Sequence, residues 1–242
     1  KESFEIKIKE LEEKVSNEIN SGNYESALEL QKIILNAVEK EFGTSHKNTA
    51  KPLNDIAVIL EKKGLYKKSK SFGERSLKIK ETVFGKDDPI TAITISNLGL
   101  VNTKLGFFDT AESLYKRAIK IFENSLGAEH HYTAQTIGLL GSLYSDQGLY
   151  SKAEPLLKRN LRIKEKTFGS DHSETTFALN NLAVLFYKQG HYNKAEELYL
   201  RSLKSQEKRI SPNYPYLFPA LNNLGLLYLD QGYYNKAETY FE

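Results

Sequence analysis

The stretch QGHYNKAE at residues 189–196 returns almost unchanged as QGYYNKAE at residues 231–238, forty-two residues later. Alignment on the glycine shows that the same spacing runs through the whole chain. The glycines of this series are Gly22, Gly64, Gly106, Gly148, Gly190 and Gly232. An aromatic residue follows each glycine by two positions, and a small residue follows that aromatic by three. The chain is therefore an array of six copies of one unit.

The apolar spacing within a unit predicts two amphipathic helices that meet at this glycine. In the fifth unit, TTFALNNLAVLFYKQG (175–190) places Leu179 and Ala183 on one helical face, and Gly190 ends the helix with a left-handed cap. Small residues such as Ala183 and Ala195 would let the two helices approach closely. Pro155 is expected in the first turn of its helix, where a proline needs no amide hydrogen. We expect twelve helices, no strand and an all-α, right-handed α-solenoid of tandem helical hairpins.

The repeat frame predicts a single array over residues 1–242. Its hairpins are expected at 4–42, 47–84, 89–126, 131–168, 173–210 and 215–242. The first helix is degenerate, because Lys14 and Glu18 stand where apolar residues are expected. The last hairpin is truncated, so that nothing follows to cover Tyr240 and Phe241. We therefore expect the chain to be a fragment of a longer one, whose uncovered C-terminal end either contacts another molecule, with self-association as one possibility, or is poorly ordered. The first residue is not Met, so we also expect the native N-terminus to be missing.

Composition and charge exclude several classes of function. The 34 basic and 31 acidic residues give a net charge of only +3, which does not predict a surface for nucleic acid or an anionic membrane. There is no cysteine, and no apolar run approaches the ~18 residues that span a bilayer. We expect no nucleic-acid or membrane partner, and a cytoplasmic location.

The turn FGSDHSET at residues 168–175 contains the residue types of a hydrolase. Neighbours in a turn splay apart, however, whereas a catalytic triad needs side chains that converge from separate positions. The histidine also belongs to a column of the repeat, namely His46, Asp88, His130, His172 and Tyr214. No cysteine or carboxylate pattern supports a metal site at the histidine turns. We expect no catalytic residue, no metal and no cofactor.

The small residues at the helix crossing and the aromatic after the turn glycine make the chain resemble the tetratricopeptide repeat family. The forty-two-residue period, with LNNLAVLFYKQGHYNKAEELYLRSL followed by a glycine-containing turn, resembles the kinesin-light-chain type of repeat over residues 21–242. The resemblance implies a superhelix in which an inward asparagine of the first helix hydrogen-bonds the backbone of an extended peptide. Asn54, Asn180 and Asn222 match that column, whereas Ser96 and Gly138 interrupt it.

The candidate peptide-binding residues therefore lie on the inner wall that the first helices are expected to form. They are Asn54, Lys62, Ser96, Lys104, Ser142, Phe177, Asn180, Tyr187, Lys188 and Asn222. Two alternatives stay open: Tyr187 and Phe177 form either an apolar hot spot or packing between hairpins. For the adjacent asparagines Asn97, Asn181 and Asn223, bridging of neighbouring hairpins is the favoured role.

Three functions are compatible with the sequence. The first is a non-catalytic scaffold that binds an extended peptide segment of a partner protein in its concave groove. The alternative is a regulatory or sensor array that controls an attached effector domain in a longer chain, and the flanking sequence would distinguish the two. The third, an enzyme, requires a convergent polar cluster that the sequence does not show.

Overall fold

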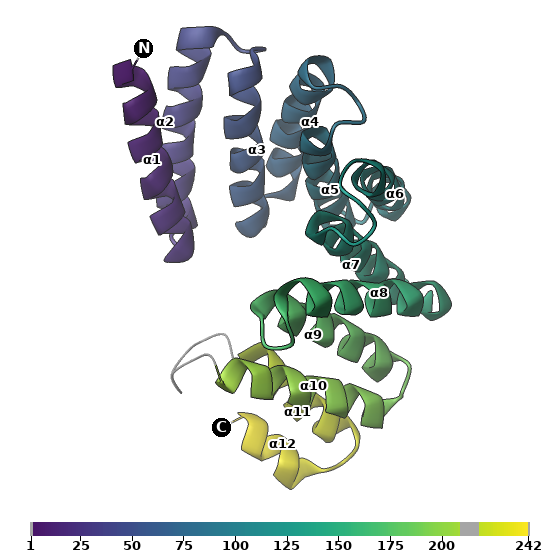
Figure 1. Ribbon diagram of the computed structural model, residues 1–242. Coiled ribbons are helices and arrows are strands. Elements are labelled where there is room, and N and C mark those ends of the chain that lie inside the picture. The colour runs from purple at the N-terminus through teal and green to yellow at the C-terminus, as the bar shows by residue number, and fades with distance from the viewer. Residues whose placement is uncertain (1, 209–217, 242) are drawn as a thin grey trace. The chain divides into compact units, whose positions relative to one another are not determined.

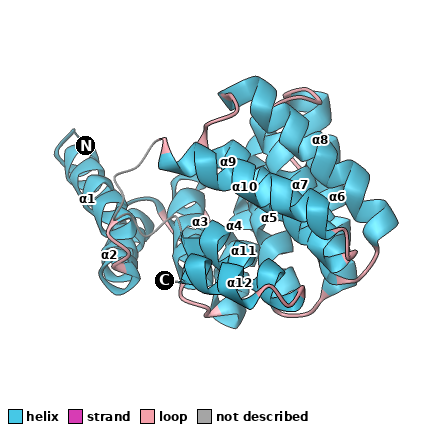
Figure 2. Cartoon of the chain, turned by 90° about the horizontal axis from the view of Figure 1, so that it is seen from below, coloured by secondary structure: helices cyan, strands magenta, loops and turns pink. Residues whose placement is uncertain are grey.

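The computed structural model describes residues 2–208 and 218–241, which form twelve α-helices and no strand (Figures 1 and 2). The helices pair as six hairpins: α1 (Glu2–Asn20) with α2 (Tyr24–Phe42), α3 (Lys47–Lys62) with α4 (Tyr66–Val83), α5 (Pro89–Lys104) with α6 (Phe108–Ser125), α7 (His131–Asp146) with α8 (Tyr150–Phe168), α9 (Ser173–Lys188) with α10 (Tyr192–Glu207), and α11 (Phe218–Asp230) with α12 (Tyr234–Phe241). The predicted all-α class is confirmed over these residues. The predicted start of the sixth hairpin at 215 lies outside them.

The hairpins group into two compact units of three, Lys1–Leu126 and Gly127–Glu242. Within each unit every helix packs on the next one along the chain, and neighbouring first helices also touch, α3 with α5 and α7 with α9. Apolar side chains such as Ile34, Leu53 and Ile56 are buried in contacts that pass from one hairpin to the next. Each unit is therefore held together by neighbour contacts, as in a solenoid.

The small residues at the helix crossings have the role that the sequence predicts. Ala183 and Ala195 are fully buried, and the hairpin turn at Gly190 has a φ of +74°, which favours glycine. At Gly99 an added β-carbon would lie 2.6 Å from a ring carbon of Tyr115. The first helix can therefore carry no larger residue there without displacing the ring.

The turns between hairpins share one pattern of hydrogen bonds. The Nδ1 atoms of His46, His130 and His172 each accept from the backbone N–H two residues later, at 3.2 Å, and so cap the next helix. Asp88 caps α5 in the same way, at 2.7 Å. Three residues after His172, the Thr175 hydroxyl donates to the carbonyl of Gly169, at 2.7 Å. Capping explains why a histidine or aspartate recurs at this position.

One expectation about a helix start is wrong. Pro155 lies in the second turn of α8 rather than its first, because the helix already begins at Tyr150. Pro52 stands at the same distance from the start of α3. Both helices continue past their proline.

Candidate binding site on the first helices

Asn54, the first residue of the predicted amide column, joins two hairpins. Its Oδ1 atom accepts from the Thr94 hydroxyl at 3.0 Å and from the Asn97 amide at 3.4 Å, and both donors belong to α5. Asn97 therefore bridges hairpins as expected, with Asn54 as its partner. Asn54 thus holds α3 against α5 through its side-chain oxygen.

The other two asparagines of the column are less engaged. Asn180 is half-buried on α9, and its Oδ1 atom is buried without a hydrogen-bond partner among the described residues. Asn222 is exposed on α11. Asn181, which was expected to bridge hairpins, is exposed and lines a hollow described below. Of these two amides, that of Asn222 is exposed, whereas the oxygen of Asn180 is buried.

Gly138, where the amide column is interrupted, lies against an asparagine on the second helix of the same hairpin. Asn160 on α8 occupies the space in front of Gly138, so that a β-carbon at 138 would overlap its Nδ2 atom. Asn160 donates from Nδ2 to the Ala134 carbonyl at 3.0 Å. The amide is thus carried by the second helix of this hairpin. Ser96, the other interruption, is only 7% exposed.

The predicted charged and aromatic residues divide into exposed side chains and links between hairpins. Lys188 on α9 pairs with Asp146 on α7 at 2.6 Å. The Tyr187 hydroxyl donates to Asp230 on α11, and this hydrogen bond to a carboxylate raises the pKa of Tyr187 to about 12. By contrast, Phe177 is 61% exposed. Of the remaining candidates, Lys62 and Lys104 are exposed, and Ser142 is half-buried.

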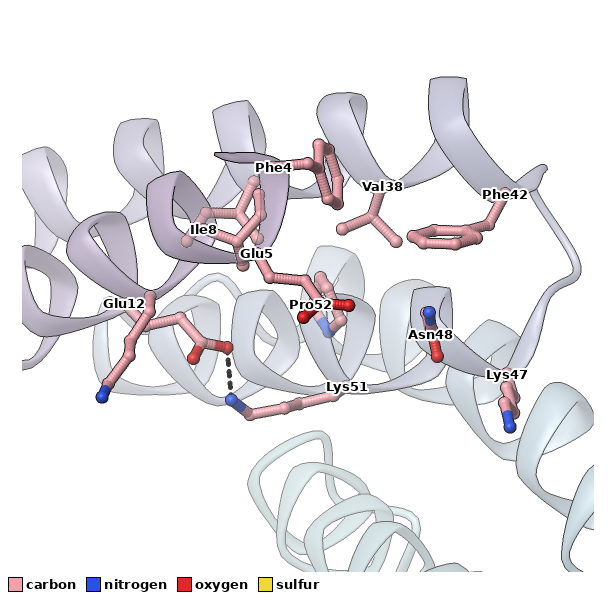
Figure 3. Close-up of a pocket in the computed structure, with 12 residues that line it drawn as sticks. Phe4, Glu5, Ile8, Glu12, Val38, Phe42, Lys47, Asn48, Lys51 and Pro52 are labelled. Atoms are coloured by element: carbon pink, nitrogen blue, oxygen red, sulfur yellow. Dashed lines mark hydrogen bonds and ion pairs between the residues drawn. The ribbon is translucent and has the colours of Figure 1, made fainter. Parts of the chain in front are cut away.

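A hollow of about 580 Å³ opens in the first unit between α1, α2 and α3 (Figure 3). Apolar side chains from α1 and α2 gather over it, and Figure 3 shows Phe4, Ile8, Val38 and Phe42 close together. An ion pair between Lys51 and Glu12 joins α3 to α1. The full lining is Phe4, Glu5, Ile8, Lys9, Glu12, Ile34, Val38, Phe42, Lys47, Asn48, Lys51 and Pro52. The hollow has an apolar interior with a charged rim.

A smaller hollow of about 190 Å³ opens in the second unit between α7, α8 and α9. Its lining is Gln135, Gly138, Leu139, Asn160, Lys164, Glu174, Phe177, Ala178 and Asn181. Seven of these residues lie 126 positions, three periods of forty-two, after a residue that lines the first hollow: Lys9 and Gln135, Glu12 and Gly138, Ile34 and Asn160, Val38 and Lys164, Asn48 and Glu174, Lys51 and Phe177, Pro52 and Ala178. The two hollows therefore occupy the same place in the repeat.

The pattern of the first helices predicts Phe177 as a site residue but predicts neither hollow. A signal was present in the second helices, where the column with Ile34 contains Asn160, and the column with Val38 contains Lys164. Asn160 stands in a column whose other residues are small or apolar, and so marks a local difference in chemistry, whereas the column of Lys164 also contains Lys80 and Gln206. The pattern of the first helices does not reveal this difference, because Asn160 and Lys164 lie on a second helix.

No group of three or more histidine, aspartate or glutamate side chains among residues 2–208 and 218–241 is arranged to hold a metal ion. Nor is any helix within them both long and apolar enough to cross a membrane.

Comparison with known proteins identifies the repeat. The tetratricopeptide repeat family model matches residues 16–82, 90–166, 139–208 and 218–242, whereas no curated protein sequence matches. Among solved structures, BtubC (BKLC) from P. vanneervenii is 20% identical with a TM-score of 0.68, covering 95% of this chain and 87% of that one.

Two further structures share the fold. The putative kinesin light chain of Podosopora anserina is 19% identical with a TM-score of 0.66, over 85% of this chain and 98% of that one. The apo form of RapI is 21% identical with a TM-score of 0.67, over 94% of this chain and 60% of that one. The fold is thus that of kinesin-light-chain-like repeats, and the chain belongs to the tetratricopeptide repeat family.

Proposed function

We propose that the chain is a non-catalytic scaffold that binds an extended peptide segment of a partner protein along its first helices. The observation that carries this proposal is the recurrence of a hollow at one place in the repeat, once in each unit. Solenoids present such repeated surfaces for recognition, and ligand sites are concave, with an apolar interior and a few polar groups.

The lining residues suggest what each hollow takes. In the first unit, Phe4, Ile8 and Val38 supply an apolar interior suited to an aliphatic or aromatic side chain of the peptide. In the second unit, the exposed ring of Phe177 stands beside polar groups. Asn180 and Asn222 are the side chains that we expect to hydrogen-bond the peptide backbone.

The proposal is tested by selecting peptides from a display library on the immobilised chain and measuring their affinity by fluorescence anisotropy. The variants Asn180→Ala, Asn222→Ala and Phe177→Ala should each weaken binding of a selected peptide, the asparagines by about 0.5–1.5 kcal/mol for a lost neutral hydrogen bond. Their melting temperatures should change little. Lys68→Ala, which removes an exposed side chain on the second helix α4, is the matched control and should bind normally.

Three results would count against the proposal. The first is a selection that yields no peptide with saturable binding. The second is an unchanged affinity of the selected peptides for all three variants. A loss of stability equal to the loss of binding would instead assign these residues to packing.

A further inference from the structure

The smaller hollow has a polar floor where its counterpart in the first unit has an apolar one. Asn160 and Lys164 lie one helical turn apart on α8 and are only 6% and 3% exposed. The corresponding residues in the first unit are Ile34 and Val38. Buried amides and ammonium groups are costly unless they are hydrogen-bonded, so this floor calls for polar partners.

In the second hairpin, a buried lysine at the equivalent position is hydrogen-bonded by groups of the protein itself. Lys80 is the counterpart of Lys164, two periods earlier, and its Nζ atom donates to the Thr94 hydroxyl at 2.8 Å and to the Ile90 carbonyl at 3.4 Å. The Thr94 hydroxyl in turn donates to Asn54 at 3.0 Å. A hydroxyl and an amide from the first helices therefore complete the hydrogen bonds around this buried lysine.

The same two positions hold no polar group in the smaller hollow. Ala178 stands in place of Thr94, and Gly138 stands in place of Asn54. Lys164 pairs with Glu174 at 2.5 Å but lacks the hydroxyl that Lys80 has. The Oδ1 atom of Asn160 is buried and has no hydrogen-bond partner within the described ranges. The floor thus presents an ammonium donor and an amide acceptor, next to a space of about 190 Å³.

We propose that this hollow binds the side-chain amide of a glutamine or asparagine in the partner peptide; this inference rests on the proposed function. The amide oxygen accepts from Lys164 Nζ, as the Thr94 hydroxyl does from Lys80, and the amide N–H donates to Asn160 Oδ1. A carboxylate is disfavoured by Glu174 and the Asn160 oxygen, and an ammonium group is disfavoured by Lys164. An alkyl group leaves the floor unsatisfied.

The test uses three small probes on the full chain: the N-acetyl, N-methylamide derivatives of glutamine, glutamate and leucine. Titration is followed by ¹H–¹⁵N NMR, with the side-chain amides of Asn160 and Asn181 as reporters. The glutamine probe should bind about fivefold more tightly than the other two, which corresponds to one net hydrogen bond.

Two variants make the test specific. Replacing the floor by that of the first unit, Asn160→Ile with Lys164→Val, should abolish the preference for glutamine while the chain stays folded. Ala178→Thr should give Lys164 a hydroxyl partner like the one that Thr94 provides for Lys80, and the glutamine probe should then be excluded. This variant provides a second readout if the double variant does not fold.

The outcomes separate this inference from the proposed function. Equal affinities for the three probes, no saturable binding of the glutamine probe, or a preference that survives the floor exchange would each overturn the amide site. Peptides selected by display would still bind in that case. If no displayed peptide binds but the glutamine preference is found, the proposed peptide-binding function fails and the amide hollow stands as a site for small ligands.

Discussion

At position 138 the choice of glycine depends on a single neighbour. The Asn160 side chain fills the space in front of it and donates to the Ala134 carbonyl. An alanine at 138 would push the amide away from that carbonyl and leave a buried polar group unsatisfied. Glycine in a helix otherwise costs up to ~1 kcal/mol relative to alanine, so glycine is retained here for space.

The first prediction is that the effect of Gly138→Ala on the free energy of unfolding depends on the residue at position 160. Gly138→Ala should lower the free energy of unfolding by about 1–3 kcal/mol, as expected for overpacking. In an Asn160→Ser background the same change should be neutral or stabilising, because serine is the residue at the equivalent positions 76 and 202 and Ser76 keeps the bond to a first-helix carbonyl. Urea unfolding of the four proteins measures both effects. Equal effects of Gly138→Ala in the two backgrounds would show that Asn160 is not the cause.

Asp55 is charged, whereas its counterparts Asn97, Asn181 and Asn223 carry a neutral amide and its counterpart in the fourth hairpin is Leu139. Burial raises the pKa of Asp55 above 3.8, and the attraction of Lys51 and Lys80 and a hydrogen bond from Asn54 only partly oppose this. Ionisation is therefore less favourable in the folded chain than in the unfolded one. Stability should be lost as the pH rises from 3.8 through the raised pKa of the folded state.

The second prediction follows from the raised pKa of Asp55. Asp55→Asn should be more stable than the parent chain at neutral pH, and the difference should shrink as the pH falls below the raised pKa. Urea unfolding across this pH range checks it, with Asp109→Asn, at an exposed position, as the control. A variant that is less stable than the parent at neutral pH would contradict the prediction.

At the scale of the helix, the turns between hairpins determine where each first helix begins. His172 caps α9 by accepting from the backbone N–H of Glu174, and its ring stacks on Phe168 with centroids 4.7 Å apart. In the third hairpin, Asp88 makes the equivalent cap. Either side chain supplies the acceptor that the first turn of a helix lacks.

The third prediction is that His172→Ala lowers the free energy of unfolding by about 1 kcal/mol, the usual cost of a lost cap. His172→Asp should recover most of that loss, because aspartate keeps the acceptor and interacts favourably with the helix dipole. Thermal and urea unfolding measure both variants. If aspartate were as destabilising as alanine, stacking on Phe168 and not capping would be the main role of the histidine.

Helix pairs are further tied together by arginines at one position of the second helix. Arg117 on α6 donates to the Glu81 carboxylate at 2.8 Å and to the Lys86 carbonyl at 2.9 Å, and so contacts both the preceding second helix and the turn after it. Arg75 makes the equivalent contact with the Thr44 carbonyl at 3.1 Å. These bonds link the second and third hairpins each to the hairpin before it.

At the scale of the whole molecule, the array consists of two compact units with three hairpins each. Stability in a solenoid is approximately a sum over repeats and their neighbour contacts, and three repeats are about the smallest stable array. Each unit contains buried contacts of its own, including those of α3 with α5 and of α7 with α9.

The fourth prediction is that residues 1–126 and 127–242 fold when they are expressed separately. Each should keep a helical far-UV circular dichroism spectrum and unfold cooperatively, with a urea m-value of about half that of the full chain, because m scales with the surface exposed on unfolding. An unfolded spectrum for either half would show that the units depend on each other for stability.

The sequence by itself determined the period, the helical hairpins and the close helix crossings. These features depend on spacing within one unit, and the forty-two-residue recurrence repeats the signal until local ambiguity disappears. Most helix boundaries follow for the same reason, since the glycine turns and the capping column mark them directly. The expectation for Pro155 is an exception, because the turn at Gly148 places the start of α8 at Tyr150, five residues before the proline.

Only the tertiary structure decided which inner side chains are free. Asn54 and Tyr187 fit the inward pattern, yet both bond to a neighbouring hairpin, at residues 40 and 43 positions away. The smaller hollow lies beside Ala178, which stands where the second hairpin has Thr94, whereas the Asn160 side chain fills the space in front of Gly138. The repeat period identifies equivalent positions in the sequence. Whether the space between the helices at those positions is filled or open depends on the side chains that meet there.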